Sequence, residues 1–447
     1  TGDTLWSCRR VIGDFGMDFG MACAADGQRV YVTGTSNMTS MTMACGNATG
    51  QPLWEQRYLP DYSTQLYKGY GIALSGDALY ACGAHWSGAV NSMRYDPASG
   101  SRQWASEYFG ATVTAGDLAV DGAGYVYSCG GWYDDFDGGV IIKYDPATGD
   151  SLWARSYRKD GAKIDLVGCA VDTQGFVYAV GPGALLKCDP ANGDTVYAAV
   201  YEGLGFLNDC ACDRNGFVYA VGARSRDIIV VKFSAADGDT LWTRTYHDAG
   251  GDEQGAFGCT VDDSGSLYLA GYTGTIRSHD FLALKCGGDG DTLWSFRYDG
   301  PEHGDDMARG CAIDPEGNLY ITGCSASGHH YDMVTLKLDT DYLGVTTGRP
   351  DAVRPLRYSM SHPWPNPANR RVGLRYTLAA PGLTTLSVYN SAGQLVRVLC
   401  RQEQAAGVHA AQWDGRDDGG QAVSSGVYFI RIRSGGYAGT KKIIMIR

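Results

Sequence analysis

Gly2-Asp3-Thr4-Leu5-Trp6, at the N-terminus, is a severed copy of a motif that recurs through the first three quarters of the chain. In each copy, a turn of Gly, Asp or Asn residues leads into a large aromatic residue. Counted from Trp6, successive aromatics are separated by 48, 50, 49, 44, 45 and 52 residues. Spacing this regular indicates a repeat architecture. The six complete copies end at Trp54, Trp104, Trp153, Tyr197, Trp242 and Trp294.

The unit that ends at Trp294 shows how each repeat is expected to fold. Residues 257–261, 266–271, 281–286 and 291–298 alternate inward and outward side chains, and Asp/Gly turns separate them. A period of two interrupted by such turns predicts four antiparallel strands. In the turn that starts at Asp262, Asp stands first and Gly265 fourth, which fits a type I turn closed by a left-handed Gly. Aspartates at this position are therefore predicted to form turns rather than bind ligands.

The two ends of the repeat region complement each other. The last unit, residues 295–338, has three predicted strands and no Trp strand, whereas residues 2–10 supply one. A single four-stranded sheet cannot bury both faces, and radial stacking leaves only short, protected edges. The sequence therefore predicts an all-β fold, a seven-bladed β-propeller over residues 1–342 closed by the N-terminal strand. Aromatic pairs such as Trp294 and Tyr298 lie on one face of the fourth strand and are expected to pack between blades.

A second module follows the repeats. Residues 343–362 are predicted to form a linker, and a Pro-rich segment begins at residue 363. Six alternating segments come next, separated by Gly-rich turns, so residues 363–447 are predicted to form a small Ig-like β-sandwich. The expected strands are 372–378, 384–389, 394–399, 407–413, 426–433 and 441–446.

Composition narrows the classes of function. The net charge is −12 and Lys and Arg do not cluster, which argues against a nucleic-acid or anionic-membrane partner. No run of about 18 apolar residues is present, so no membrane span is predicted. The chain begins with Thr1 rather than Met, which suggests that a leader or tag has been removed.

The chain has fourteen cysteines, and most occupy repeated positions. Five of seven blades carry Cys in the first strand, where the other two carry Ile72 and Leu118, so Cys behaves there as a small buried hydrophobe. A strand lies between the two members of pairs such as Cys23 and Cys45, so their backbones should be roughly 9 to 10 Å apart. This distance is beyond the reach of a disulfide. We therefore expect mostly free, buried thiols. Cys82 and Cys129, at equivalent places in adjacent blades, are the pair most worth examining for a disulfide, and the absence of a Cys-x-x-Cys motif argues against structural zinc.

Two stretches of the chain resemble known families. The segments from Tyr144 to Trp153 and from Asp314 to Gly323 resemble SBBP-type and quinoprotein-like propeller repeats. In the second module, Pro365-Asn366-Pro367, Val388-Tyr389-Asn390, Trp413-Asp414-Gly415 and Ser425-Gly426-Val427-Tyr428-Phe429 resemble the FlgD-type Ig-like fold and the type IX secretion sorting domains of secreted bacterial proteins. The second resemblance implies export across an outer membrane to an extracellular or cell-surface location. It leaves open whether the module is a sorting signal or a retained structural part.

The resemblances imply different functions. Quinoprotein dehydrogenases imply a redox cofactor on the propeller axis, but they usually have eight blades, and the chain contains no vicinal Cys pair, sialidase Asp box or recognisable nucleophile motif. The leading hypothesis is a non-enzymatic extracellular protein that makes protein contacts and self-assembles, through contacts of its propeller and Ig-like module, into a surface layer or filament. The alternatives are a quinone-dependent oxidoreductase and a carbohydrate-active or glycan-binding propeller. No cofactor is expected, and calcium is the one candidate ion.

Candidate site residues lie in loops. Acidic residues, Asp209 among them, precede several first strands, which predicts either a solvated acidic face near the axis or a calcium site. The candidate metal ligands are Asp18, Asp165 and Asp306. Loops between the second and third strands carry aromatics on which a partner or glycan could stack, or which could instead cap a blade edge. These candidate ligand-binding residues are Trp86, Trp132 and Tyr133.

Overall fold

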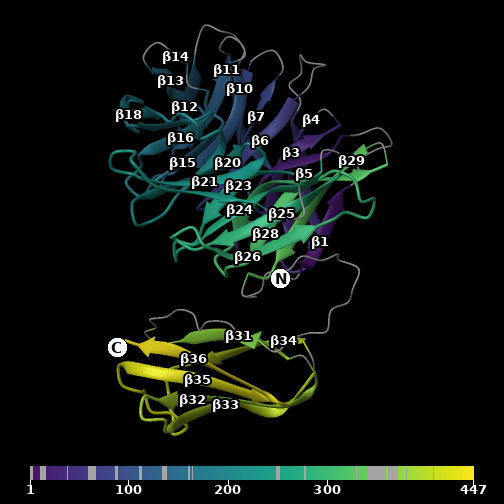
Figure 1. Cartoon of the computed structure of the whole chain (residues 1–447), viewed down its shortest axis with the longest axis vertical. Helices are drawn as coiled ribbons and strands as arrows, with labels where there is room; N and C mark the ends of the chain where they lie inside the picture. The colour runs from purple at the N-terminus through teal and green to yellow at the C-terminus, as the bar shows by residue number, and fades with distance from the viewer. Residues whose placement is uncertain are drawn as a thin grey trace. The chain divides into compact units, whose positions relative to one another are not determined.

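The computed structural model describes most of the chain as β-structure (Figure 1). Contacts divide it into two compact units, Thr1–Arg349 and Pro350–Arg447. In the described part, no helix has the length and hydropathy needed to cross a membrane. The described residues are 4–10, 17–37, 39–58, 67–85, 89–109, 113–132, 138–159, 162–163, 165–247, 252–275, 278–328, 330–340, 359–360, 368, 371–378, 380–405 and 407–446.

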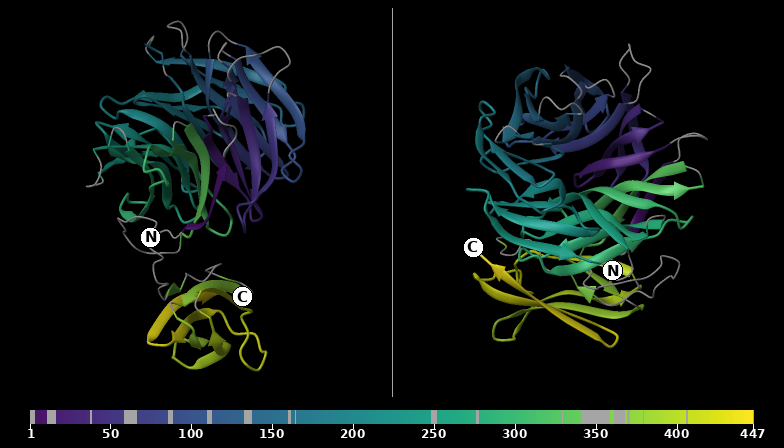
Figure 2. Two further views of the ribbon diagram at one scale, coloured as in Figure 1. Left: turned by 90° about the vertical axis from the view of Figure 1, so that its right-hand side faces the viewer. Right: turned by 45° about the horizontal axis from the view of Figure 1, so that its top comes forward.

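The first unit is a seven-bladed propeller of antiparallel sheets, as predicted (Figure 2). Blade one contains β2 (Phe19–Ala25), β3 (Arg29–Ser36), β4 (Thr39–Gly46) and β5 (Pro52–Tyr58). Blade two contains β6 (Tyr67–Ser75), β7 (Ala78–His85), β8 (Ala89–Tyr95) and β9 (Arg102–Phe109). Blade three contains β10 (Val113–Val120), β11 (Val126–Trp132), β12 (Gly139–Tyr144), β13 (Ser151–Lys159) and an added short strand, β14 (Ala162–Lys163).

The remaining blades repeat the four-stranded order. Blade four contains β15 (Gly168–Val171), β16 (Val177–Gly181), β17 (Ala184–Cys188) and β18 (Thr195–Val200). Blade five contains β19 (Phe206–Cys212), β20 (Phe217–Arg224), β21 (Asp227–Ser234) and β22 (Thr240–Tyr246). Blade six contains β23 (Glu253–Val261), β24 (Leu267–Thr275), β25 (Ser278–Cys286) and β26 (Thr292–Tyr298).

Blade seven joins the two ends of the repeat region. It contains β27 (Asp306–Ile313), β28 (Leu319–Ser327), β29 (His330–Leu338) and β1 (Thr4–Arg10), in the order β1-β29-β28-β27. Strand β1 is antiparallel to β29, with Trp6 opposite Lys337 and Arg10 opposite Met333. The green end of the propeller therefore lies beside its purple beginning in Figure 1. The prediction that the N-terminal strand completes the ring is confirmed.

The repeated aspartates close turns, as predicted. Asp121 Oδ1 accepts hydrogen bonds from the backbone N–H groups of Ala123 and Tyr125, each at 2.9 Å, and Oδ2 accepts one from the Tyr127 hydroxyl at 2.9 Å. The glycine that ends this turn, Gly124, has a φ of 91°, a conformation that favours Gly. Since both carboxylate oxygens serve the turn and the adjacent strand, this carboxylate has a structural role. Three other turns follow the pattern with Asp172 and Tyr178, Asp262 and Tyr268, and Asp314 and Tyr320.

The large aromatic residue of the outer strand, Trp in six blades and Tyr197 in blade four, packs on the next blade. Trp54 Nε1 donates to the carbonyl of Pro97 at 3.1 Å, and Trp104 Nε1 donates to that of Pro146 at 3.0 Å. Gly100 has a φ of +72°, and a Cβ there would lie 2.5 Å from the Trp54 ring. The indole thus rests directly on backbone. The predicted role of the aromatics in blade-to-blade packing is confirmed.

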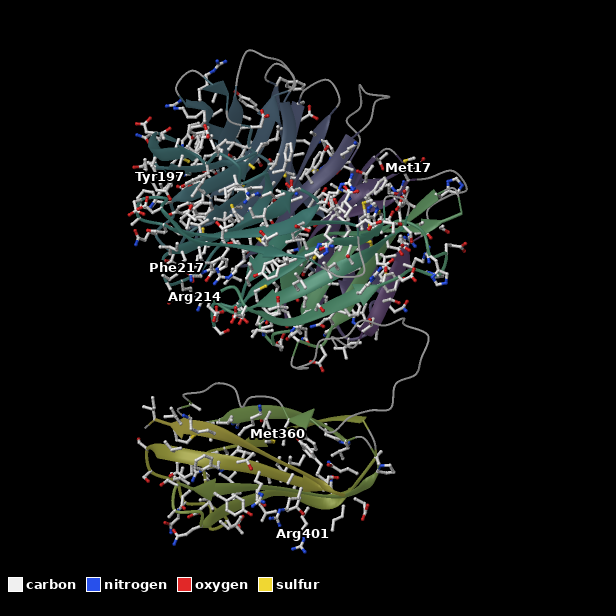
Figure 3. The ribbon with its side chains drawn as sticks, viewed as in Figure 1. Met17, Tyr197, Arg214, Phe217, Met360 and Arg401 are labelled. Atoms are coloured by element: carbon white, nitrogen blue, oxygen red, sulfur yellow. The ribbon has the colours of Figure 1, made fainter. Side chains whose placement is uncertain are left out.

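The second unit is a two-sheet β-sandwich. One sheet has the order β30-β31-β34, from β30 (Ser359–Met360), β31 (Val372–Leu378) and β34 (Gly407–Trp413). The other has the order β33-β32-β35-β36, from β33 (Leu395–Gln404), β32 (Gly382–Asn390), β35 (Gly426–Ser434) and β36 (Tyr437–Met445). Its core includes the fully buried Trp413 and the buried Met360, which is labelled in Figure 3. Strand β30 was not predicted, and it falls inside the predicted linker, residues 343–362. The other residues of that linker lie outside the described part of the chain.

Candidate functional site

The innermost strands of six blades carry a β-bulge at the same position. A bulge leaves one residue unpaired and re-aims its side chain. In these six blades the unpaired residue lines a cavity of about 500 Å³, to which all seven blades contribute. In blade four the residue just before β15 takes the same place. The seven bulge-position residues are Met21, Tyr70, Gly116, Val167, Asn208, Phe257 and Arg309.

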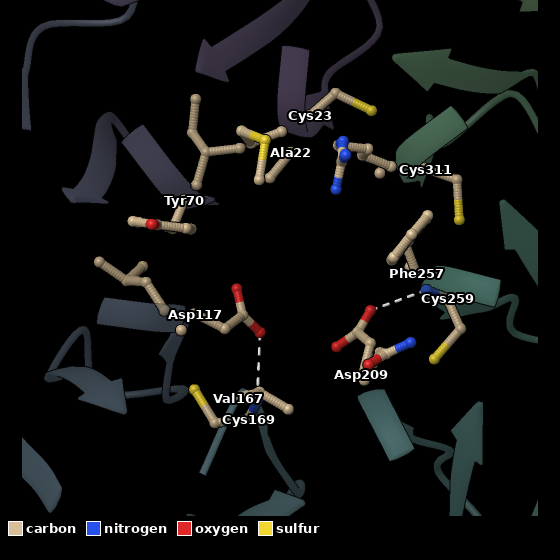
Figure 4. Close-up of a pocket in the computed structure, with 18 of the residues that line it drawn as sticks. Ala22, Cys23, Tyr70, Asp117, Val167, Cys169, Asp209, Phe257, Cys259 and Cys311 are labelled. Atoms are coloured by element: carbon tan, nitrogen blue, oxygen red, sulfur yellow. Dashed lines mark hydrogen bonds between the residues drawn. The ribbon is translucent and has the colours of Figure 1, made fainter. Parts of the chain in front are cut away.

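Two carboxyl groups face this axial cavity, Asp117 from blade three and Asp209 from blade five (Figure 4). Asp117 Oδ2 accepts the backbone N–H of Cys169 at 3.1 Å, and Asp209 Oδ2 accepts that of Cys259 at 2.7 Å. Each carboxyl thus bridges its own blade to the next. Burial raises the pKa of Asp117 to about 6 and raises that of Asp209 well above its usual range.

The position of these acids depends on small residues elsewhere in the ring. The residue after the bulge is Ala22 in blade one and Gly in four other blades, and it is Asp only in blades three and five. A Cβ at Gly71 would lie 2.7 Å from Asp117 Oδ1, and one at Gly168 would lie 3.1 Å from Asp209 Oδ1. Glycine in the preceding blade therefore leaves room for each carboxyl.

The cavity also presents a cation and an amide. The guanidinium carbon of Arg309 lies 4.7 Å from the centre of the Phe257 ring, at cation–π distance. Arg309 Nε is buried and makes no hydrogen bond within the described residues. Asn208 Nδ2 donates to the carbonyl of Ala256 at 2.8 Å. The lining therefore combines both signs of charge with an amide and aromatic rings.

Thiols surround the bulge positions. All fourteen cysteines are free and eleven are buried, as predicted for small buried hydrophobes. Cys82 and Cys129, the pair singled out as a possible disulfide, are both free and buried. Burial raises the pKa of Cys210, Cys259 and Cys311 well above its usual value, so these groups are neutral thiols near pH 7. The five that line the cavity are Cys23, Cys169, Cys210, Cys259 and Cys311.

An anionic quinone does not fit this lining. Quinone cofactors that carry carboxylates need several cationic partners, whereas the charged residues of the cavity are Asp117, Asp209 and Arg309. Two carboxyls beside one guanidinium would repel such a ligand when ionised. The chemistry of the cavity instead suits a neutral, zwitterionic or cationic group.

The structure separates the three predicted metal ligands. Asp18 is buried, and its Oδ1 accepts the backbone N–H of Asn37 at 3.2 Å. Asp165 lies just before blade four, and it shares no carboxylate cluster with the other two. Asp306 does join a cluster, but with Asp280 and Asp299, and oxygens of these three carboxylates lie within 4.8 Å of one another. Among the described residues this is the one group of three or more potential metal ligands.

The predicted aromatic ligand site lies largely outside the described residues. Trp86 and Tyr133 are not described, and Trp132 is described only as the last residue of β11, where its backbone pairs with Val113. Their stacking role therefore stays a prediction. Of the acids expected near the axis, Asp209 does reach the cavity, whereas Asp117 was missed. The sequence indicated Asp117 only through its place in an innermost strand, at a position where most blades carry Gly or Ala.

Comparisons with known proteins agree with the two-part fold. Residues 1–203 match the model for outer membrane protein assembly factor BamB, and residues 367–436 match the FlgD Ig-like domain. A search of curated proteins found no match. One solved structure similar to this chain is PorZ, described as an essential bacterial surface component of the type-IX secretion system of Porphyromonas gingivalis. The identity is 12% and the TM-score 0.38, and the match covers 95% of this chain and 65% of PorZ.

The chain spans less than two thirds of PorZ, and neither family model reaches half of the chain. The two models nevertheless fall on the two compact units, one on the propeller and one on the sandwich. The repeat and Ig-like resemblances in the sequence are thereby confirmed. This protein joins a β-propeller whose residues 1–203 match the BamB model to a β-sandwich whose residues 367–436 match the FlgD Ig-like domain.

Proposed function

We propose that this chain is a non-enzymatic interaction protein of the bacterial cell exterior that recognises a partner through the axial cavity of its propeller. The observation that carries the proposal is the contrast between what the blades repeat and what they vary. All seven blades place a tyrosine on the second strand, and each of these residues is buried. They are Tyr31, Tyr80, Tyr127, Tyr178, Tyr219, Tyr268 and Tyr320.

The bulge position, in contrast, holds a different residue type in every blade: Met, Tyr, Gly, Val, Asn, Phe and Arg. The backbone geometry there is shared by six blades, so the scaffold does not require this variety. Varied side chains that converge on one cavity are what a specific recognition site needs. A volume of about 500 Å³ also suits a small ligand or one or two side chains of a partner.

The ionisable groups of the cavity favour binding over catalysis. Asp117 and Asp209 each accept a backbone N–H of the neighbouring blade through Oδ2, so one oxygen of each carboxyl is committed to the scaffold. The thiols beside them have raised pKa values, which disfavours the nucleophilic thiolate. The described lining contains no histidine that could serve as a general base.

The exterior location is supported by the Ig-like module. Its match to the FlgD Ig-like domain accompanies sequence motifs that resemble the type IX sorting domains of exported bacterial proteins. Fractionation of producing cells tests this part directly. Recovery in the outer-membrane or culture fraction is expected, and retention in the cytoplasm would contradict it.

A combined peptide and glycan array, probed with labelled full-length protein, tests the recognition role. We expect saturable binding to one class of arrayed ligand, and glycan hits would favour the lectin version. Absorbance spectra and a dye-linked dehydrogenase assay on protein from its native source test the oxidoreductase alternative. A bound quinone chromophore with dye reduction would contradict the non-enzymatic proposal.

Self-assembly is a second candidate function, and a recurrent exposed side chain favours it. Six outer strands carry an exposed aliphatic residue immediately before the packed aromatic: Leu5, Leu53, Leu152, Val196, Leu241 and Leu293. Their exposed fractions, 42% to 54%, are large for aliphatic residues at a shared position. Mass photometry and negative-stain imaging should show polymers that Leu53→Ser combined with Leu241→Ser weakens. Monomers alone at all concentrations would contradict self-assembly.

A further inference from the structure

We propose that Asp280, Asp299 and Asp306 bind a divalent cation, with calcium the best match, where blade six meets blade seven. Asp280 lies on β25, Asp299 follows β26 directly, and Asp306 begins β27. Oxygens of the three carboxylates lie within 4.8 Å of one another. Three oxygens with this spacing share a central point no more than about 2.8 Å from each of them, so a small inward movement of the side chains brings all three to a calcium–oxygen distance of about 2.4 Å.

Unpartnered oxygens in the same place point to a missing ligand. Ser325 is fully buried, and its Oγ lies beside the Asp306 carboxylate and the Tyr298 hydroxyl without a hydrogen bond of good geometry to either. A Cβ on Gly300 would lie 2.4 Å from Ser325 Oγ and 2.7 Å from Asp306 Oδ1, so the hydroxyl adjoins the cluster. Asp299 Oδ1 is likewise buried without a partner among the described residues. Carboxylate and hydroxyl oxygens are hard ligands of the kind that calcium prefers.

The groups around the cluster leave it negatively charged. Arg297 Nε pairs with Asp280 Oδ2, and His303 Nδ1 contacts Asp299 Oδ2 at 2.8 Å. The backbone N–H groups of Gly300 and Ala326 donate to Asp306. Three carboxylates thus face one guanidinium and one imidazole. A divalent ion would offset the remaining charge.

The neighbouring blades provide internal comparisons. Between blades five and six, the equivalent positions hold Asp227, His247 and Gln254, and His247 pairs with Asp227 at 2.8 Å. Between blades seven and one, Asp332 pairs with Arg9 at 2.6 Å, and Asp18 takes the place of Asp306. Among these three junctions, the sequence supplies an acid at all three positions only between blades six and seven. The fold therefore does not require an acid at all three positions. A bound ligand accounts for the three acids between blades six and seven.

Calorimetric titration of the full-length, EDTA-treated protein with CaCl₂, and separately with MgCl₂, tests the proposal. Wild-type protein should bind one Ca²⁺ with a Kd no weaker than about 1 mM, the range of extracellular calcium modules. Asp299→Asn should weaken binding about tenfold or more, since it removes one charged ligand. Asp332→Asn, which breaks the equivalent ion pair of the next blade, is the matched control and should leave the affinity unchanged.

Terbium luminescence provides a second readout. Tb³⁺ is a calcium substitute, and Tyr298 adjoins Asp299 in sequence, so excitation of tyrosine should sensitise bound Tb³⁺. Tyr298→Phe should reduce the emission without changing the affinity, and excess Ca²⁺ should displace the signal. Circular dichroism establishes that each variant is folded, and Asp299→Ser replaces Asp299→Asn if the latter is not. No heat or emission change up to about 5 mM cation, or unchanged affinity in the folded Asp299 variant, would overturn the proposal.

Discussion

Trp6 Nε1 donates a hydrogen bond of 2.7 Å to the backbone carbonyl of Asn47, across the seam where blade seven meets blade one. Two further contacts come from the same face of β1: Cys8 Sγ lies 3.9 Å from Cys45 Sγ, and Arg10 pairs with Glu55 at 2.7 Å. Side chains two residues apart share a face of a strand. Strand β1 therefore completes the sheet of blade seven along its edge and holds blade one with its side chains.

Removal of this seam should open the propeller. Trp6→Ala is expected to lower the free energy of unfolding by about 2 to 4 kcal/mol, because it deletes a large, partly buried ring and a hydrogen bond. Leu5→Ala, at a neighbouring residue that is 45% exposed, should change it by less than about 0.5 kcal/mol. Urea unfolding followed by circular dichroism measures both. Equal stability of the two variants would show that the Trp6 contact does not hold the ring closed.

The glycine beneath each tryptophan offers a second test. Gly100→Ala introduces a Cβ that would meet the Trp54 ring at 2.5 Å, at a φ of +72°. Gly76 has a φ of +59° and open space around it, so Gly76→Ala has the backbone strain without the clash. We expect Gly100→Ala to lower the free energy of unfolding by about 1 to 3 kcal/mol more than Gly76→Ala does, as measured by thermal or urea unfolding. A difference near zero would mean that the indole moves aside freely.

Asp117 predicts a pH dependence of stability. Its pKa rises from 3.8 to about 6 on folding because of burial. The folded state therefore keeps a proton that the unfolded chain has lost, and this stabilisation, complete below pH 3.8, disappears as the pH rises through about 6. Asp117→Asn keeps an oxygen for the Cys169 N–H and cannot ionise. The free energy of unfolding of Asp117→Asn, relative to that of wild type, should therefore rise by about 1 to 3 kcal/mol between pH 4 and pH 8.

Asp96 provides a control of opposite sign for that experiment. Hydrogen bonds from Ser99 lower the pKa of this exposed carboxylate. Asp96 therefore stabilises the folded state at neutral pH, and this contribution is lost as the pH falls. The free energy of unfolding of Asp96→Asn should be closest to that of wild type at acidic pH. Urea unfolding across the pH range measures both variants. Parallel pH curves for wild type and Asp117→Asn would contradict the buried-acid interpretation.

Cys8 should be the most reactive thiol. A hydrogen bond from Cys45 lowers the pKa of Cys8 to about 7, and Arg10 acts in the same direction. The same hydrogen bond, together with burial, raises the pKa of Cys45, and burial raises that of Cys23. Iodoacetamide labelling with peptide mass spectrometry should modify Cys8 first, at a rate that rises through about pH 7. Arg10→Gln should slow the reaction. Faster labelling of Cys212 or Cys400, which are also partly exposed, would contradict this assignment.

Much of the propeller could be predicted because its determinants are local and repeated. Period-two alternation, Asp/Gly turns and the severed Trp motif each identify strands without reference to distant residues, and the pairing of β1 with β29 follows from counting them. The candidate sites were harder to predict. Asp117 reaches the axis only because a bulge re-aims the strand, and the sequence pattern did not show the bulge. Asp280 and Asp299 join Asp306 across two blades, so their proximity depends on packing between sheets rather than on spacing along the chain.

The recognition role of the axial cavity is the central claim, and competition between variants on the peptide and glycan arrays tests it most directly. Wild type, Tyr70→Ala, Arg309→Ala and, as the control on an exposed outer strand, Phe109→Ala are compared at equal concentration. The first two remove side chains that line the cavity, whereas Phe109 is 66% exposed and lies on β9. We predict that both cavity variants lose the array signals of wild type by about tenfold or more while Phe109→Ala keeps them. Signals unchanged in Tyr70→Ala and Arg309→Ala would contradict recognition at the axis.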